Sequence, residues 1–158
     1  MRTLGLPGFA LLLASLLTGC AGDGGDGGGG GPQPCQPQVD PAAAPRFASN
    51  IQPIYDRSCS FPSCHSSVAP QEALDLSPGR AYPDTVGKRA MQRPDLQLVD
   101  PGDPDDSYLL KKVRGDPDIA GVLMPQGCPG TPLAGAQCLT ADEIDAIATW
   151  ILACAPNN

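Results

Sequence analysis

Apolar residues recur at helical spacing in the stretch between Arg46 and Arg57. One helical face of this stretch carries Phe47, Ile51, Ile54 and Tyr55. Pro53 lacks a backbone N–H, so the helix should kink or restart there. The pattern predicts an amphipathic helix that leads directly into Cys59.

A second amphipathic helix is predicted close to the C-terminus. Thr140 and Glu143 have the spacing of a capping box, in which each side chain accepts a hydrogen bond from the other residue's backbone. The apolar residues that follow at helical spacing are Ile144, Ile147, Ala148, Ile151 and Leu152.

A third helix is predicted to start near Asp103. This residue can cap the helix, Pro104 suits the first helical position, and the two acidic residues that follow favour the positive end of the helix dipole. Gly115 can end the helix. The predicted buried side consists of Tyr108, Leu109, Leu110 and Val113.

Prolines and glycines interrupt residues 66–101, which predicts loops with at most a short helix. The apolar residues of this stretch that could line a pocket are Leu74, Leu76, Leu96, Leu98 and Val99. Taken together, the patterns predict one mostly α domain of three to four helices, spanning about residues 46–156.

The first 19 residues resemble a bacterial lipoprotein signal peptide. A short positive start precedes an apolar run, and Leu17-Thr18-Gly19-Cys20 fits the cleavage motif. Cleavage would leave Cys20 as a lipidated N-terminus on the periplasmic side of the cell envelope. The alanine that follows Cys20 slightly favours the outer membrane. An ordinary secretory signal would also export the chain.

Residues 20–45 are predicted to form a flexible linker after the lipid anchor. Gly, Pro, Gln and Ala dominate this stretch, which has too little apolar content to fold by itself. A disordered tether of this kind would let the domain work a short distance from the membrane.

Acidic residues outnumber basic ones in the whole chain, with 17 Asp and Glu against 10 Lys and Arg and a formal net charge of −7. Nucleic acids and anionic lipids are therefore disfavoured as partners, because both require clustered positive charge. A partner with a basic docking surface would be attracted instead.

The sequence CSFPSCH, residues 59–65, contains the only histidine of the chain. Two cysteines with a histidine directly after the second are the attachment signature of c-type haem: the thiols of Cys59 and Cys64 add to the haem vinyl groups, and His65 binds the iron. Four residues separate these cysteines instead of the usual two. A Cys59–Cys64 disulfide is an alternative, whereas zinc lacks enough ligands.

Met124 is the candidate for the second axial ligand of the iron. Met1 is lost with the signal peptide, and Met91 lies among three basic residues. Met124 lies in an apolar turn before Pro125, which favours an extended backbone at Met124. The alternative for Met124 is an ordinary role in filling the core.

Four further cysteines remain after the lipidated and haem-binding ones. Cys128 and Cys138 flank a short loop, so we predict that they form a disulfide, which leaves Cys35 to pair with Cys154. Four cysteines allow three pairings, and the sequence alone does not select among them.

Several of these segments resemble bacterial class I cytochromes c. The similar segments are FASNIQPIYDRSC, PGDPDDSYLLKKVRG, the Met124-Pro125 pair and LTADEIDAIATWILACAP, within about residues 46–155. The resemblance implies crossing terminal helices around one covalent haem c, His65 and Met124 as iron ligands, and Trp150 near the haem edge. Candidates to bind the haem propionates are Arg80, Tyr82, Lys88 and Arg89.

The expected function is one-electron transfer by a lipid-anchored cytochrome, because two protein ligands leave no open iron position for catalysis. Two alternatives stay open. A haem-free, disulfide-stapled lipoprotein could bind a protein or glycan with the same helices. A haem enzyme subunit would require Met124 to be absent from the iron.

Overall fold

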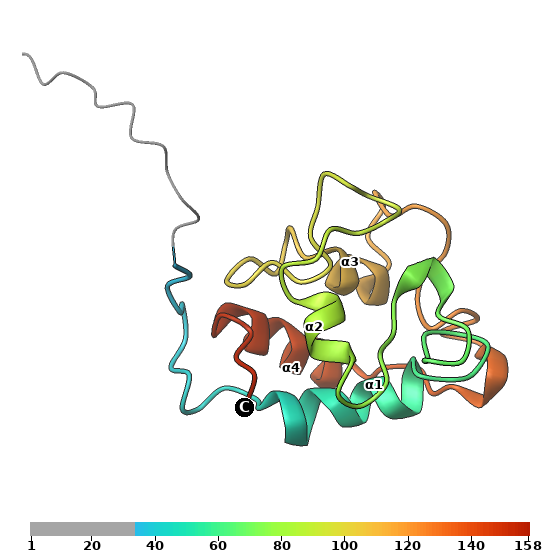
Figure 1. Ribbon diagram of the computed structural model, residues 1–158, viewed down its shortest axis with the longest axis horizontal. Helices are drawn as coiled ribbons and strands as arrows, with labels where there is room; N and C mark the ends of the chain where they lie inside the picture. The colour runs from blue at the N-terminus through green and yellow to red at the C-terminus, as the bar shows by residue number, and fades with distance from the viewer. Residues whose placement is uncertain (1–33) are drawn as a thin grey trace, which may run out of the picture. The chain divides into compact units, whose positions relative to one another are not determined.

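The computed structural model describes residues 34–158 (Figure 1). The predicted signal peptide and the lipidation site Cys20 lie outside these residues. Four α-helices and three shorter helical segments make up the regular structure, and residues 34–158 form isolated β-bridges but no strand. The predicted mostly α class is confirmed for this part of the chain.

The first helical region joins two segments. A π-helical turn, η1 (Phe47–Ile51), runs directly into α1 (Gln52–Ser58). Pro53 lies in the first turn of α1, directly after the π-helical turn, so the α-helical hydrogen-bond pattern starts anew at the proline, as predicted. The predicted apolar face is buried, with Ile51 and Tyr55 at 1% exposure or less.

Helix α4 (Ala141–Leu152) begins with the predicted capping box. The Glu143 N–H donates to Thr140 Oγ1 at 3.3 Å, and the Thr140 N–H donates to Glu143 Oε2 at 2.9 Å. Ile147, Trp150 and Ile151 are fully buried, because α4 packs against both η1 and the third helix, α3.

Helix α3 (Tyr108–Arg114) starts later than predicted. Asp103 caps a turn instead of a helix: its Oδ1 accepts hydrogen bonds from the N–H groups of Asp105 and Asp106, both at 3.1 Å. The Ser107 hydroxyl donates to the Asp103 carbonyl at 2.7 Å, which closes this turn before the helix begins. Gly115 ends α3 in the left-handed conformation (φ 75°), as predicted.

Residues 66–101 are mainly loops, as predicted. They contain the short helix α2 (Ala81–Thr85) and one 3-10 turn, η2 (Gln71–Ala73); a second such turn, η3 (Leu133–Gly135), lies farther along the chain. Figure 1 shows that the loops after α1 and the loops before α4 lie on the same side of the domain.

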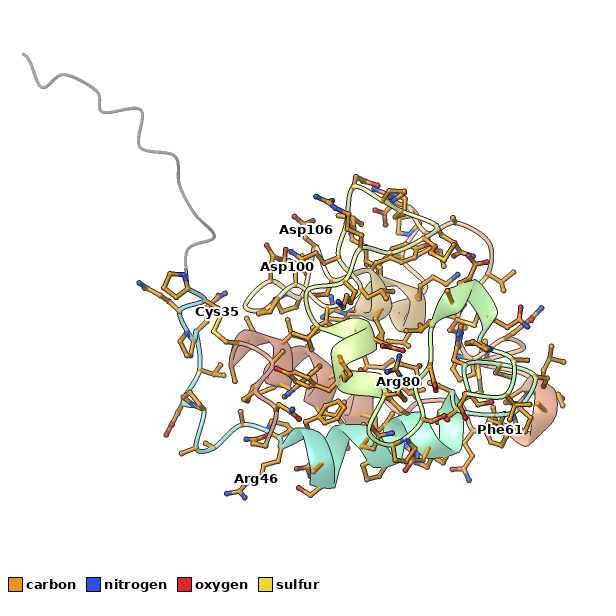
Figure 2. The ribbon with its side chains drawn as sticks, in the orientation of Figure 1. Cys35, Arg46, Phe61, Arg80, Asp100 and Asp106 are labelled. Carbon is orange, nitrogen blue, oxygen red and sulfur yellow. A yellow bond between two sulfur atoms is a disulfide. The ribbon has the colours of Figure 1, made fainter. Side chains whose placement is uncertain are left out.

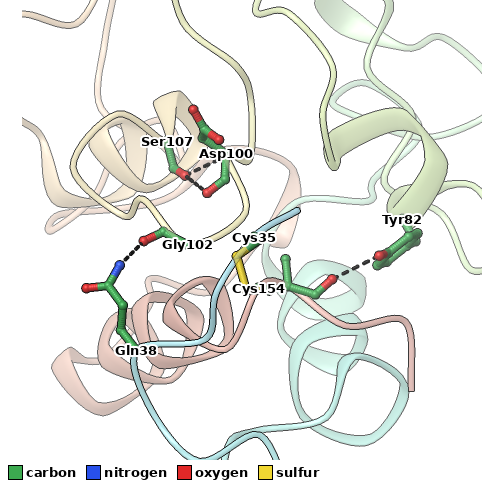
Figure 3. The surroundings of a disulfide bond; sticks show 8 residues. Cys35, Gln38, Tyr82, Asp100, Gly102, Ser107 and Cys154 are labelled. Atoms are coloured by element: carbon green, nitrogen blue, oxygen red, sulfur yellow. Dashed lines mark hydrogen bonds between the residues drawn. A yellow bond between two sulfur atoms is a disulfide. The ribbon is translucent and has the colours of Figure 1, made fainter. Parts of the chain in front are cut away.

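The folded domain starts earlier than Arg46, where the sequence placed its beginning. Cys35 forms a disulfide with Cys154, and the Gln38 side chain donates to the Gly102 carbonyl (Figure 3). The Gln38 N–H also donates to the Leu152 carbonyl at 2.9 Å, and Ala44 is buried. These tertiary contacts order residues 34–45 despite their Pro-rich composition, so that part of the predicted 20–45 linker belongs to the domain.

An aromatic cluster occupies the centre of the helical core. The ring centroid of Phe47 lies 5.2 Å from that of Tyr82 and 5.5 Å from that of Trp150. The Trp150 indole N–H donates to the Pro156 carbonyl at 3.0 Å, so its polar group is satisfied by the C-terminal segment. The cluster joins η1, α2 and α4.

Candidate functional site

A cavity of about 330 Å³ lies between α1, α3, α4 and the loops that connect them. This volume falls within the range of roughly 300–1,000 Å³ that is typical of ligand sites. Cys59, His65 and Met124 all line it, although Met124 is far from the other two in sequence. Its apolar wall consists of Leu74, Leu76, Leu98, Leu109, Val113, Leu139 and Ile147.

A second cavity of about 230 Å³ shares Cys59, His65 and Met124 with the first and adds Cys64. The structure therefore brings together the four residues that sequence analysis selected for haem attachment and iron ligation. Figure 2 places this region, marked by Phe61, on the opposite side of the folded domain from Cys35.

The loop that carries both cysteines is folded by its own backbone hydrogen bonds. The Cys59 N–H donates to the Tyr55 carbonyl at 2.8 Å, and the His65 N–H donates to the Cys59 carbonyl at 3.1 Å. The His65 carbonyl accepts from the Leu76 N–H at 2.8 Å, which fixes the end of the loop. Cys59 and Cys64 are both half-buried and are not bonded to each other.

The imidazole of His65 is oriented by the backbone of the following loop. Its Nδ1 lies 3.1 Å from the Gln71 carbonyl oxygen, so Nδ1 carries the proton and donates, and Nε2 is left with its lone pair. Burial lowers the pKa of His65; hydrogen bonds with the Gln71 and Leu74 backbone oppose this shift, and the Lys112 charge adds to it. The neutral imidazole is the form that binds a metal.

Burial also dominates the chemistry of Cys59. The pKa of this thiol is raised to about 12: removal from water is the main cause, the neighbouring Cys64 adds to the shift, and Arg57 opposes it. Cys59 is therefore a neutral thiol at physiological pH.

Two methionines reach the main cavity, where the sequence selected one. Met124 is half-buried, and its N–H donates to the Lys112 carbonyl at 2.8 Å, which attaches it to the last turn of α3. Met91, which sequence reasoning set aside because of its charged neighbours, also lines the cavity but is 63% exposed. Charged neighbours in sequence did not keep Met91 away from the cavity.

Positive charge gathers around the main cavity of this acidic chain. The basic residues that line it are Arg80, Lys88, Arg89 and Lys112, and the acidic ones are Glu72 and Asp84. Arg80 pairs with Asp84 at 3.1 Å, so part of this charge is already neutralised. The remaining balance favours an anionic group at the cavity.

Two residues that the sequence placed near the cofactor lie elsewhere. The Tyr82 hydroxyl donates to the Ala155 carbonyl at 2.9 Å, in the contact drawn in Figure 3, and Tyr82 does not line the cavity. Trp150 does not line the cavity either, because its ring packs in the aromatic cluster. Leu96 and Val99 are also absent from the cavity wall, and Val99 is buried in the core.

Tyr55 is a cavity residue whose role the sequence did not reveal. Its side chain is 1% exposed and lines the main cavity, yet its hydroxyl has no hydrogen-bond partner among the described residues. Burial, and then Cys59, raise the pKa of this phenol, so it stays protonated and can donate. The sequence did contain one signal: Tyr55 lies on a predicted apolar face, where a phenylalanine would pack equally well without a hydroxyl group.

Both disulfides join the cysteine pairs expected from the sequence. Cys35 bonds Cys154, and Cys128 bonds Cys138 with a Cα–Cα distance of 5.7 Å. Within residues 34–158, no cluster of three or more His, Cys, Asp or Glu side chains could hold a metal ion, and no helix is long and apolar enough to span a bilayer. No family model, curated protein or solved structure matches the chain.

Proposed function

We propose that the domain is a cytochrome c-like one-electron carrier that binds one haem c. Cys59 and Cys64 would hold the haem through thioether bonds, and His65 and Met124 would be the two axial ligands. The observation that carries this proposal is the meeting of both unbonded cysteines, the only histidine and Met124 at two adjoining cavities.

The residues around these cavities fit a haem in several ways. The leucine-rich wall suits an apolar macrocycle, and the positive charge of Lys88, Arg89 and Lys112 suits its two propionates. The buried Tyr55 hydroxyl, which has no partner within residues 34–158, would gain an acceptor in such a ligand. A haem would also supply apolar bulk to a chain that is only 4% aromatic.

When bound, the haem would supply an iron that alternates between the ferric and ferrous states. His65 is prepared to ligate because the Gln71 carbonyl fixes both its tautomer and its ring orientation. With Met124 as the second ligand, the chain itself would fill both axial positions and exclude water and substrates. Electron transfer, and not catalysis at the iron, follows from that arrangement.

The proposed cellular setting comes from the sequence. A lipid on Cys20 would anchor the protein in the cell envelope, and a linker after it would let the acidic domain meet a redox partner with a basic docking surface. Unbonded Cys59 and Cys64 weigh against the haem-free alternative, because the disulfide expected there is missing while both other pairs are bonded.

The test is the visible spectrum of the protein produced with a c-type maturation system, oxidised and then reduced with dithionite. We expect a sharp reduced α band and, in the oxidised form, the weak far-red band that marks methionine–iron ligation in cytochromes c. The Met124→Ala variant should lose the far-red band, and the matched Met91→Ala variant should keep it. A colourless protein would overturn the proposal, and loss of the band only in Met91→Ala would overturn the ligand assignment.

A further inference from the structure

We propose that the Cys128–Cys138 disulfide positions Met124 for iron ligation, so that opening this bond exposes the iron to external ligands. The inference rests on the proposed function, since it assigns Met124 to the iron. It concerns the loop of residues 125–138, which separates Met124 from α4 and is called the disulfide loop below.

The disulfide loop forms one wall of the smaller cavity. Pro125, Gln126, Leu133 and Ala136 line that cavity together with Cys64 and His65. Met124 lines it too and lies at the start of the loop. Any movement of the loop therefore changes the wall that Met124 shares with the attachment residues.

Side-chain burial holds the disulfide loop in place only at its first residue, Pro125. None of the residues 126–138 is buried, and Leu133 is 54% exposed. Segments that bury little apolar surface open locally at low free-energy cost. The loop must therefore be fixed by covalent or backbone contacts.

Those contacts are few. The Leu133 N–H donates to the Gln126 carbonyl at 3.0 Å, and the Gln137 N–H donates to the Arg57 carbonyl at 3.1 Å. The loop also folds tightly over Gly127, where an added Cβ would lie 2.2 Å from the Thr131 carbonyl oxygen. The Cys128–Cys138 bond joins the two sides of this fold.

Met124 is held by backbone hydrogen bonds on either side of it and by the buried Pro125 that follows it. Its N–H donates to the Lys112 carbonyl at 2.8 Å, and after it the Cys128 N–H donates to the Pro125 carbonyl at 3.1 Å. This second bond ends at the disulfide, so the bond between Cys128 and Cys138 limits how far the Met124-Pro125 segment can move. Without it, the loop gains conformational entropy, and the restraint that follows the buried Pro125 is weakened.

The test compares two disulfide-free variants of the haem-loaded protein. Cys128→Ser/Cys138→Ser opens the disulfide loop, and Cys35→Ser/Cys154→Ser removes the bond at the other side of the domain as a matched control (Figure 2). Both keep Cys59, Cys64 and His65, so intact mass should show one haem in each. The readouts are the far-red band and the affinity of the ferric protein for imidazole.

We expect the loop variant to lose most of its far-red band and to bind imidazole about tenfold more tightly, because a Met-free iron position becomes populated. The control should match the wild type in both measurements. An unchanged band and an unchanged imidazole affinity in the loop variant would overturn the inference. Wild-type protein without haem would overturn the proposed function instead, which is a different result.

A second variant disturbs the same loop without removing a disulfide. Gly127→Ala keeps both disulfides but places a Cβ against the Thr131 carbonyl at a residue with φ +99°. It should weaken the far-red band in the same direction. In haem-free protein, Cys128→Ser/Cys138→Ser should speed hydrogen exchange of the Met124 amide, relative to the wild type, more than it speeds exchange of the buried core amide of Ile147. Equal increases at the two amides would contradict the inference.

Discussion

The helical core and the cavity side of this domain are stabilised in different ways. In the core, η1, α1 and α4 bury continuous apolar faces around Phe47, Tyr82 and Trp150. On the cavity side, exposed loops are fixed by backbone hydrogen bonds and by the Cys128–Cys138 bond. Burial of apolar side chains stabilises the helical core. Closure of the loops positions the reactive side chains that line the cavity.

The two disulfides follow the same division. Cys35–Cys154 closes a sequence separation of 119 residues and joins both ends of the core, whereas Cys128–Cys138 closes a separation of only 10 beside the cavity. The first therefore restricts the unfolded chain more strongly than the second. The second is placed to affect the site more than the fold.

Removal of the core disulfide should have the largest effect on stability. Cys35→Ser/Cys154→Ser should lower the free energy of unfolding by about 5 kcal/mol, against about 2.5 kcal/mol for Cys128→Ser/Cys138→Ser, because the longer loop loses more closure entropy. Urea unfolding of the haem-free proteins measures both. Equal losses would show that the two regions do not differ in this respect.

Truncation of one apolar side chain in each region tests packing directly. Ile151 is fully buried away from the cavity, so Ile151→Ala should cost about 3 kcal/mol. Leu98 is half-buried and lines the cavity, so Leu98→Ala should cost only about 1 kcal/mol in haem-free protein, because one side of its side chain has few neighbours to lose. The free energies of unfolding are compared from urea midpoints measured at equal slopes. A larger loss of stability for Leu98→Ala than for Ile151→Ala would contradict the prediction.

Removal of the unpartnered Tyr55 hydroxyl should have a smaller effect on stability than the Ile151 truncation, and it should stabilise the protein. Tyr55→Phe should stabilise the haem-free protein by about 1 kcal/mol, because it removes a buried polar group without a partner. Tyr108→Phe is the control: its hydroxyl bonds Gln92 at 3.1 Å and the Ala120 N–H at 3.0 Å, so its removal should destabilise. Thermal unfolding measures both, and a destabilised Tyr55→Phe would mean that the hydroxyl has a partner in solution.

The smallest expected effect lies at the start of α4. Burial alone would raise the pKa of Glu143, but its bonds with Thr140 and the neighbouring Arg57 outweigh burial and lower this pKa. The stabilisation is therefore present above about pH 4.5, the ordinary pKa, and is lost as the pH falls through the lowered value. Glu143→Gln should cost no more than about 0.5 kcal/mol at pH 7. Its stability should converge with that of the wild type under acidic conditions.

Periodic sequence patterns predicted the core well because burial repeats with the helix. The apolar faces around Ile51 and Ile147 and the capping box of Thr140 were evident without structure. Asp103 was misassigned because an aspartate that caps a turn and one that caps a helix have the same local signature. The later start of α3 depends on the Ser107 hydroxyl, which no pattern reveals.

On the cavity side, the candidate residues were selected by their chemistry and not by periodicity. Cys59, Cys64 and His65 were recognisable from their motif, but loops decide which distant residues join them. Met91 and Tyr55 line the cavity, whereas Tyr82 and Trp150 do not. Tertiary packing decides this difference. The order of residues 34–45 likewise depends on a disulfide partner at the far end of the chain.

The most direct test of the account is the intact mass of the protein after production with a c-type maturation system and denaturation. We predict a mass increased by one haem, with Cys59 and Cys64 both blocked to alkylation and no added mass in Cys59→Ala/Cys64→Ala. A protein of unmodified mass, with these two thiols free or linked to each other, would contradict the proposed cytochrome function.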